Sequence, residues 1–170
     1  MRLVILTGAS GSGKTAIAEA IGATRSSLVD VLHFDSIGVP SAEVRRAWDP
    51  VGGWQRAMTL DWMRRIAAVR DPDRPVLFEG QMRLSFIAEG LLAAGIADAR
   101  PILVDCDDAT RTRRLVTNRG QPELANPDMM NWAAYLRREA KEGGHDVLDT
   151  THLSLDKCVE RICAVLLPTP

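Results

Sequence analysis

The sequence predicts an α/β fold in which five parallel strands form one sheet that is sandwiched by helices. Short apolar runs rich in branched residues alternate with longer segments whose apolar residues recur at helical spacing. Glycine, proline and aspartate interrupt the chain between these segments. The 170 residues suffice for one domain with a single core, so we expect one domain over residues 1–170.

The expected strands are aliphatic runs that both faces of a sheet can bury. In chain order they are Arg2–Thr7, Leu28–Phe34, Val76–Phe78, Pro101–Asp105 and Asp146–Leu148. The expected helices are amphipathic, and some carry capping residues such as Ser41 before the helix or Gly95 after it. In chain order they are Thr15–Ile21, Ser41–Trp48, Trp54–Arg70, Leu84–Ala94, Asp108–Asn118, Asp128–Lys141 and Asp156–Leu167.

The loop after the first expected strand carries the most specific motif of the chain. The phosphate-binding pattern G-x-x-x-x-G-K-[ST] matches the run Gly8, Ala9, Ser10, Gly11, Ser12, Gly13, Lys14 and Thr15. The glycines let the backbone curve so that its N–H groups point at phosphate oxygens. Lys14 would contact the β- and γ-phosphates, and the Thr15 hydroxyl would bind Mg²⁺. The motif therefore predicts a P-loop NTPase fold that binds a nucleoside triphosphate with Mg²⁺.

Acidic residues follow two expected strands, at the sheet edge where open α/β sheets bind ligands. Asp35 would orient or deprotonate the hydroxyl of a phosphoryl acceptor, and the alternative is a helix N-cap. Glu79 would help to hold Mg²⁺ through water, and the alternative is a surface glutamate. Gly80 would let substrate or backbone approach closely. Strand alternation places His33 on the side of Asp35, where a packed histidine is the favoured interpretation.

Arginines near the expected site offer planar donors for phosphate groups. Arg114 and Arg119 would contact ATP beside a lid at about 119–127, a polar segment without an apolar pattern. Arg119 would also neutralise charge on the transferring phosphoryl group. The pair Arg137 and Arg138 is expected on an ordinary solvated face.

The segment of about 35–70 is expected to bind the acceptor. Trp48 and Trp54 would line an acceptor pocket there or pack in the core. Arg83 would bind an anionic group of the substrate or be solvated at a helix start. Thr150, after the fifth strand, would border the adenine or belong to the N-cap region of the last helix.

Composition argues against several other partners. The net charge of −1 gives no overall attraction to nucleic acid, and no apolar run reaches membrane-spanning length. The three cysteines match no zinc-site spacing and indicate free thiols in a reducing compartment. We therefore expect a cytoplasmic monomer or small homo-oligomer whose partner is a small-molecule acceptor.

On these motifs the chain resembles the small P-loop kinases of the nucleoside-monophosphate-kinase, shikimate-kinase and gluconate-kinase type, and also the chloramphenicol-type phosphotransferases. Asp35 resembles the aspartate that contacts the acceptor hydroxyl in the small-molecule kinases. The segment Glu79–Arg83 resembles the Asp-Gly-Phe-Pro-Arg segment of nucleoside monophosphate kinases, in which the acid supports Mg²⁺ and the arginine holds the acceptor phosphate. Two departures are the glutamate at position 79 and His33, which stands where shikimate kinases carry a second acid.

The resemblance implies an enzyme that transfers the γ-phosphoryl group of ATP to a hydroxyl of a small molecule. One alternative is a nucleoside monophosphate kinase, whose acceptor is a phosphate. A second alternative is a nucleotide-binding ATPase switch or regulatory module that has no acceptor.

Overall fold

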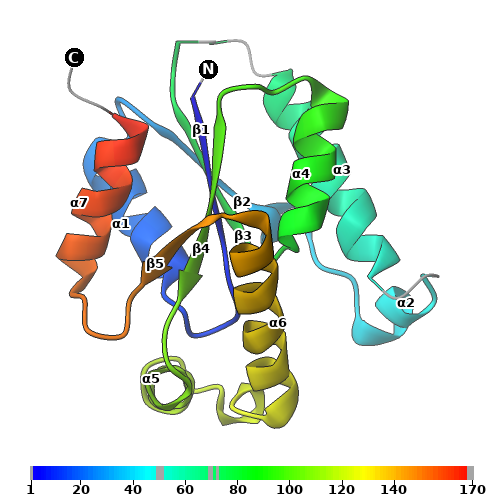
Figure 1. The fold of residues 1–170 in the computed structure, drawn as a ribbon, viewed down its shortest axis with the longest axis vertical. Helices are drawn as coiled ribbons and strands as arrows, with labels where there is room; N and C mark the ends of the chain where they lie inside the picture. Colours follow the sequence, from blue (N-terminus) through cyan, green and yellow to red (C-terminus); the bar gives the residue numbers. More distant parts are fainter. Residues whose placement is uncertain (1, 49–51, 69–70, 72, 168–170) are drawn as a thin grey trace.

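A parallel five-stranded sheet forms the centre of the protein (Figure 1). The computed structural model describes residues 2–48, 52–68, 71 and 73–167. The strand order is β2-β3-β1-β4-β5, and each neighbouring pair is parallel. The strands are β1 (Leu3–Thr7), β2 (Asp30–His33), β3 (Val76–Gly80), β4 (Ala99–Asp105) and β5 (Asp146–Asp149). The predicted α/β sheet is confirmed.

Helices cover both faces of this sheet (Figure 1). One face packs against α1 (Lys14–Arg25) and α7 (Leu155–Leu166). The other face packs against α3 (Gly53–Ala67), α4 (Leu84–Ala94) and α6 (Pro127–Gly143). The shorter elements are α2 (Ala42–Arg46), α5 (Asp108–Arg113), the 3₁₀ turns η1 (Phe34–Ile37) and η3 (Pro122–Leu124), and the π-helical turn η2 (Arg114–Asn118).

Strand β1 divides the core into two halves. Leu3 and Ile5 pack against one set of helices, and Val4 and Leu6 pack against the other. All four side chains are fully buried, as two-sided burial of a central strand requires. Each contributes about 1.5–3 kcal/mol through burial of apolar surface. The apolar strand thereby fixes the position of the loop that follows it.

Several boundaries differ from the sequence expectation. Strand β2 ends at His33 because Phe34 begins the turn η1. The helix expected over 108–118 changes from α-helical to π-helical geometry at Arg114, a change often found at functional sites. The end of the helix expected over 54–70 and most of the break expected over 49–53 lie outside the described residues. In the described parts of the chain, every helix is too short or too polar to cross a bilayer.

Candidate functional site

The P-loop joins the carboxyl end of β1 to the start of α1. Gly11 and Gly13 have φ angles of 80° and 100°, which strain any residue with a Cβ atom. A Cβ atom on Gly8 would overlap the backbone carbonyl oxygen of Val104 in β4. The loop therefore requires its glycines. Its backbone curves around the N-terminus of α1, where free N–H groups and the helix dipole favour an anion.

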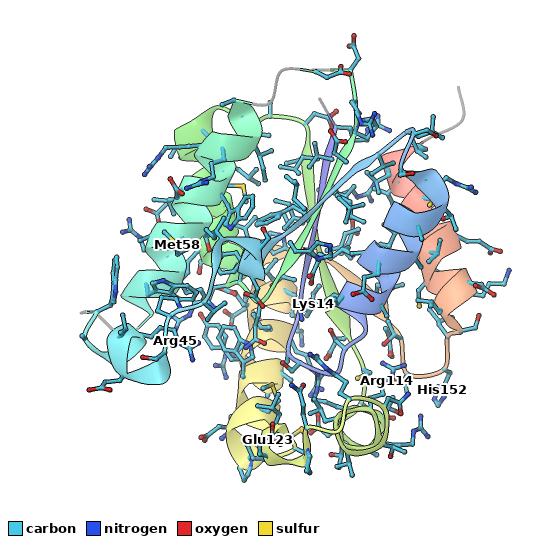
Figure 2. All side chains as sticks on the ribbon, turned by 180° about the vertical axis from the view of Figure 1, so that it is seen from behind. Lys14, Arg45, Met58, Arg114, Glu123 and His152 are labelled. Atoms are coloured by element: carbon cyan, nitrogen blue, oxygen red, sulfur yellow. The ribbon has the colours of Figure 1, made fainter. Side chains whose placement is uncertain are left out.

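Lys14 is buried beside this loop, near the centre of the molecule, with Arg114 on one side and Arg45 on the other (Figure 2). Burial lowers the pKa of the Lys14 ammonium below its usual value. The carboxylates of Glu79 and Asp35 act in the opposite direction, and the charge of Arg119 lowers the pKa further. A buried cation at the mouth of an N–H cradle is suited to the terminal phosphates of a nucleotide. The residues present therefore fit a bound triphosphate.

Glu79 lies beside the P-loop and is nearly buried. Its Oε2 accepts a hydrogen bond from the Thr15 hydroxyl at 3.2 Å, and its Oε1 lies 2.8 Å from His33 Nδ1. The two residues predicted to hold Mg²⁺ are thus in contact. Hydroxyl and carboxylate oxygens suit Mg²⁺, which takes few protein ligands and completes its shell with phosphate oxygens and water.

Asp35 lies within the turn η1, not at its N-cap, which is His33. Its side chain is exposed and has no hydrogen-bond or ion-pair partner among the described residues. Its charge raises the pKa of Lys14, and its turn follows β2 at the sheet edge from which the P-loop leaves β1. A solvent-accessible carboxylate near the phosphate site is available to an acceptor hydroxyl.

Gly80 packs so closely against Phe34 that a Cβ atom at position 80 would overlap the Phe34 Cβ. The Phe34 carbonyl accepts a hydrogen bond of 3.1 Å from Trp62 Nε1. The Phe34 ring packs edge-on against Trp54, with 5.8 Å between the ring centres. Trp54 and Trp62 are therefore buried core residues, whereas Trp48 is exposed. The absence of a side chain at position 80 lets Phe34 of η1 pack closely on β3.

Arg83 lies among three aromatic rings. Its guanidinium carbon lies 5.1 Å from the ring centre of Tyr135, 5.2 Å from Phe86 and 5.9 Å from Trp132. Arg83 Nε is buried, and within the described residues it has no hydrogen-bond partner. Among the described residues, ring faces and no carboxylate hold this cation, so it keeps donors for an anionic group.

Arg114 and Thr150 tie the P-loop to the loop after β5. Arg114 Nη1 donates to the carbonyl oxygens of Gly11 (3.4 Å) and Ser12 (3.2 Å) and to Thr150 Oγ1 (2.8 Å). Arg114 Nη2 donates to the Thr150 carbonyl at 2.8 Å. Thr150 Oγ1 itself lies 2.8 Å from the Ser12 carbonyl oxygen. Both side chains thus support the loop backbone as well as lining the cavity beside it.

That cavity has a volume of about 480 Å³. Its polar side is formed by the P-loop together with Arg114 and the exposed Arg119. Its apolar side is formed by Leu153, Leu155 and Cys158. The cavity combines a phosphate cradle with an apolar wall, as a nucleotide requires.

Two arginines that the sequence did not assign to the site stabilise the P-loop region by hydrogen bonds outside the cavity. Arg111 is fully buried, and its Nη1 donates to the carbonyl of Ser10 in the P-loop at 2.9 Å. Asp105 at the end of β4 accepts hydrogen bonds from both Arg111 and Arg137. The sequence did contain a signal for this cluster: Asp105 ends an apolar strand, and polar residues at strand ends line the ligand sites of such sheets.

Arg137 departs from the expected solvated face, whereas its neighbour Arg138 is exposed as expected. Its Nη2 donates to Asp108 Oδ1 at 2.8 Å, in addition to the contact with Asp105. Partial burial disfavours its charge, but the hydrogen bonds to Asp105 and Asp108 outweigh burial and raise the Arg137 pKa. Helix α6 is therefore joined to the end of β4 by charge-assisted hydrogen bonds.

Comparison with solved structures confirms the resemblance to small P-loop kinases at the level of fold. A gluconokinase from Sinorhizobium meliloti 1021 has a TM-score of 0.70 at 16% identity, over 97% of this chain and 91% of that chain. A sugar kinase from Janibacter sp. HTCC2649 also has a TM-score of 0.70, at 20% identity over 99% and 96% of the two chains.

A shikimate kinase from Acinetobacter baumannii, in complex with shikimate, has a TM-score of 0.66 at 15% identity over 98% of this chain and 93% of that chain. No protein-family model matches the chain, and no curated protein sequence matches it. The chain therefore has the P-loop kinase fold, and these structural neighbours are small-molecule kinases.

Proposed function

We propose that this protein is a kinase that transfers the γ-phosphoryl group of ATP, with Mg²⁺, to a hydroxyl of a small molecule. The observation that carries the proposal is the hydrogen bond of Thr15 to Glu79 beside the buried Lys14 at a P-loop that requires its glycines. The exposed Asp35 follows β2 at the same edge of the sheet. The kinase fold of the structural neighbours supports it.

Each residue has a role that its position supports. Lys14 would bind the transferring phosphoryl group and balance the charge that develops there. Thr15 would hold Mg²⁺ directly and Glu79 through water, and the ion would neutralise phosphate charge. Asp35 would orient the acceptor hydroxyl and accept its proton. Arg119 would approach the phosphates from the segment of about 119–127, which would act as a lid.

The acceptor would bind between η1 and α4, in the region of about 35–70 together with Arg83. Gly80, buried against Phe34, would contribute by letting η1 pack closely on β3. An anionic group on the acceptor would find free donors on Arg83. The same observation favours a second candidate, a nucleoside monophosphate kinase, in which Arg83 would hold the acceptor phosphate. Asp35 favours the hydroxyl acceptor, because its carboxylate would repel a second phosphate.

Release of ADP from ATP across a panel of acceptors tests the proposal. The panel contains sugars, sugar acids, hydroxylated cyclic acids, nucleosides, hydroxyl-bearing antibiotics and nucleoside monophosphates. We expect ADP to form with one acceptor class. The Asp35→Asn variant should then lose about 10²- to 10⁴-fold in kcat, with ATP affinity nearly unchanged.

Two other results would change the assignment. A monophosphate as the sole productive acceptor would establish the second candidate. ATP binding without acceptor-dependent turnover on any member of the panel would contradict both candidates and favour a nucleotide-dependent switch. The exposed Asp156→Asn variant is the matched control for Asp35.

A further inference from the structure

His33 is a further polar residue near the P-loop, and it lies outside the residues that line the cavity. It ends β2, the edge strand of the sheet, and the parallel register pairs it with Glu79 in β3. Its Nδ1 lies 2.8 Å from Glu79 Oε1, and its side chain is half-buried. The other oxygen of Glu79 accepts the Thr15 hydroxyl. His33, Glu79 and Thr15 thus form one chain of hydrogen bonds that ends at the P-loop.

The direction of these hydrogen bonds follows from their chemistry. A carboxylate only accepts, so both His33 Nδ1 and Thr15 Oγ1 must donate to Glu79. A threonine that donates its proton to Glu79 keeps the lone pairs of its oxygen out of that hydrogen bond, so the oxygen can still bind a cation. A carboxylate that is nearly buried needs two such donors to stay in one orientation.

We propose that His33 is a positioning residue that fixes the Glu79 carboxylate and, through it, the Thr15 hydroxyl for the Mg²⁺ of the nucleotide. This inference rests on the proposed function, because it concerns the same ion. Groups that hold metal ligands in place change metal affinity by about 10- to 100-fold when they are lost. His33 would act through Glu79 and would not touch the ion, the nucleotide or the acceptor.

The first test is the tautomer of His33, which reports its hydrogen bond without any nucleotide. Long-range ¹H–¹⁵N correlation spectra of the free protein at mildly alkaline pH should show a neutral His33 ring that carries its proton on Nδ1. The chain has three histidines, and loss of a signal in the His33→Asn variant assigns it. A neutral ring with its proton on Nε2 would overturn the inference.

The second test separates binding of the ion from binding of the nucleotide. Calorimetric titrations with ATP, with and without Mg²⁺, are run on the wild type, His33→Leu and His33→Asn. We expect His33→Leu to reduce the affinity gained from Mg²⁺ by about 10- to 100-fold, with metal-free ATP affinity unchanged within about two-fold. His33→Asn, which keeps a donor near Nδ1, should recover most of the gain. The exposed His152→Asn variant is the control.

Several outcomes would overturn the inference. These are an unchanged Mg²⁺ gain in His33→Leu, an equal loss of ATP affinity with and without Mg²⁺, or no recovery in His33→Asn. Failure of the wild type to bind ATP at all would instead refute the proposed function, and the tautomer measurement would still decide the His33–Glu79 contact.

Discussion

Asp105 gives the sharpest test of how buried charge supports the P-loop. It balances Arg111, whose side chain is 0% exposed, and it also binds Arg137. Replacement by asparagine leaves the Arg111 guanidinium buried without a counter-charge, which costs about 3–5 kcal/mol. For a chain of this length, that loss lowers Tm by roughly 6–20 °C, at about 2–4 °C per kcal/mol. Urea denaturation and scanning calorimetry measure both quantities.

A matched control removes the same kind of group from the surface. Asp146 pairs with Arg100 at 2.7 Å, but the two side chains are 51% and 58% exposed. Asp146→Asn should therefore cost at most about 1 kcal/mol. Equal losses of stability in Asp105→Asn and Asp146→Asn would refute the reasoning, because burial would then not decide the strength of the pair.

Two further perturbations test the packing of the site. Lys14→Met should abolish the rise in Tm on addition of ATP with Mg²⁺, while the free protein becomes at least as stable as the wild type. Because burial lowers the pKa of Lys14, the unfolded wild type binds more protons between the folded and unfolded pKa values, so wild-type stability rises with pH there. The advantage of Lys14→Met should therefore shrink as pH rises toward about 10, and a constant advantage would contradict the burial argument. Gly80→Ala should cost about 1–3 kcal/mol in urea, because the new Cβ overlaps Phe34. Gly22→Ala, whose Cβ would lie at an ordinary 3.5 Å from Val31, should be neutral or stabilising; equal effects of the two substitutions would refute the steric explanation.

The parts of the site that sequence reasoning predicts well are those that depend on neighbouring residues in the chain. The P-loop is one continuous run, and its glycines adopt the backbone that the motif demands. The aliphatic run 3–6 before it specifies burial on both faces. These features need no knowledge of tertiary contacts, because local backbone geometry and strand periodicity determine them.

The parts that sequence reasoning misses depend on the register and packing of distant segments. The contact of His33 with Glu79 joins residues 46 apart and requires the register of β2 against β3. Arg137 is 32 residues from Asp105, and its helical position alone is equally compatible with solvent. Charged residues show their partners only when the order of strands brings them to one sheet edge.

The two sides of the proposed active site differ in how firmly they are held. On the nucleotide side, Arg111 and Arg114 bind consecutive carbonyl oxygens of the P-loop from α5 and η2. On the acceptor side, Trp62 Nε1 and Gln55 Nε2 donate to the carbonyl oxygens of Phe34 and Gln81. The segment between these contacts is held less firmly, because its side chains at Ile37, Val44 and Trp48 are exposed. Phosphate chemistry is the same for every acceptor, so a fixed cradle serves all of them. Each acceptor requires its own set of apolar and polar contact groups, so these groups must differ between kinases with different acceptors. Such differences cost little stability on an exposed segment. If the acceptor binds at about 35–70, as proposed, its identity is encoded in these residues, where likeness of fold constrains the sequence least.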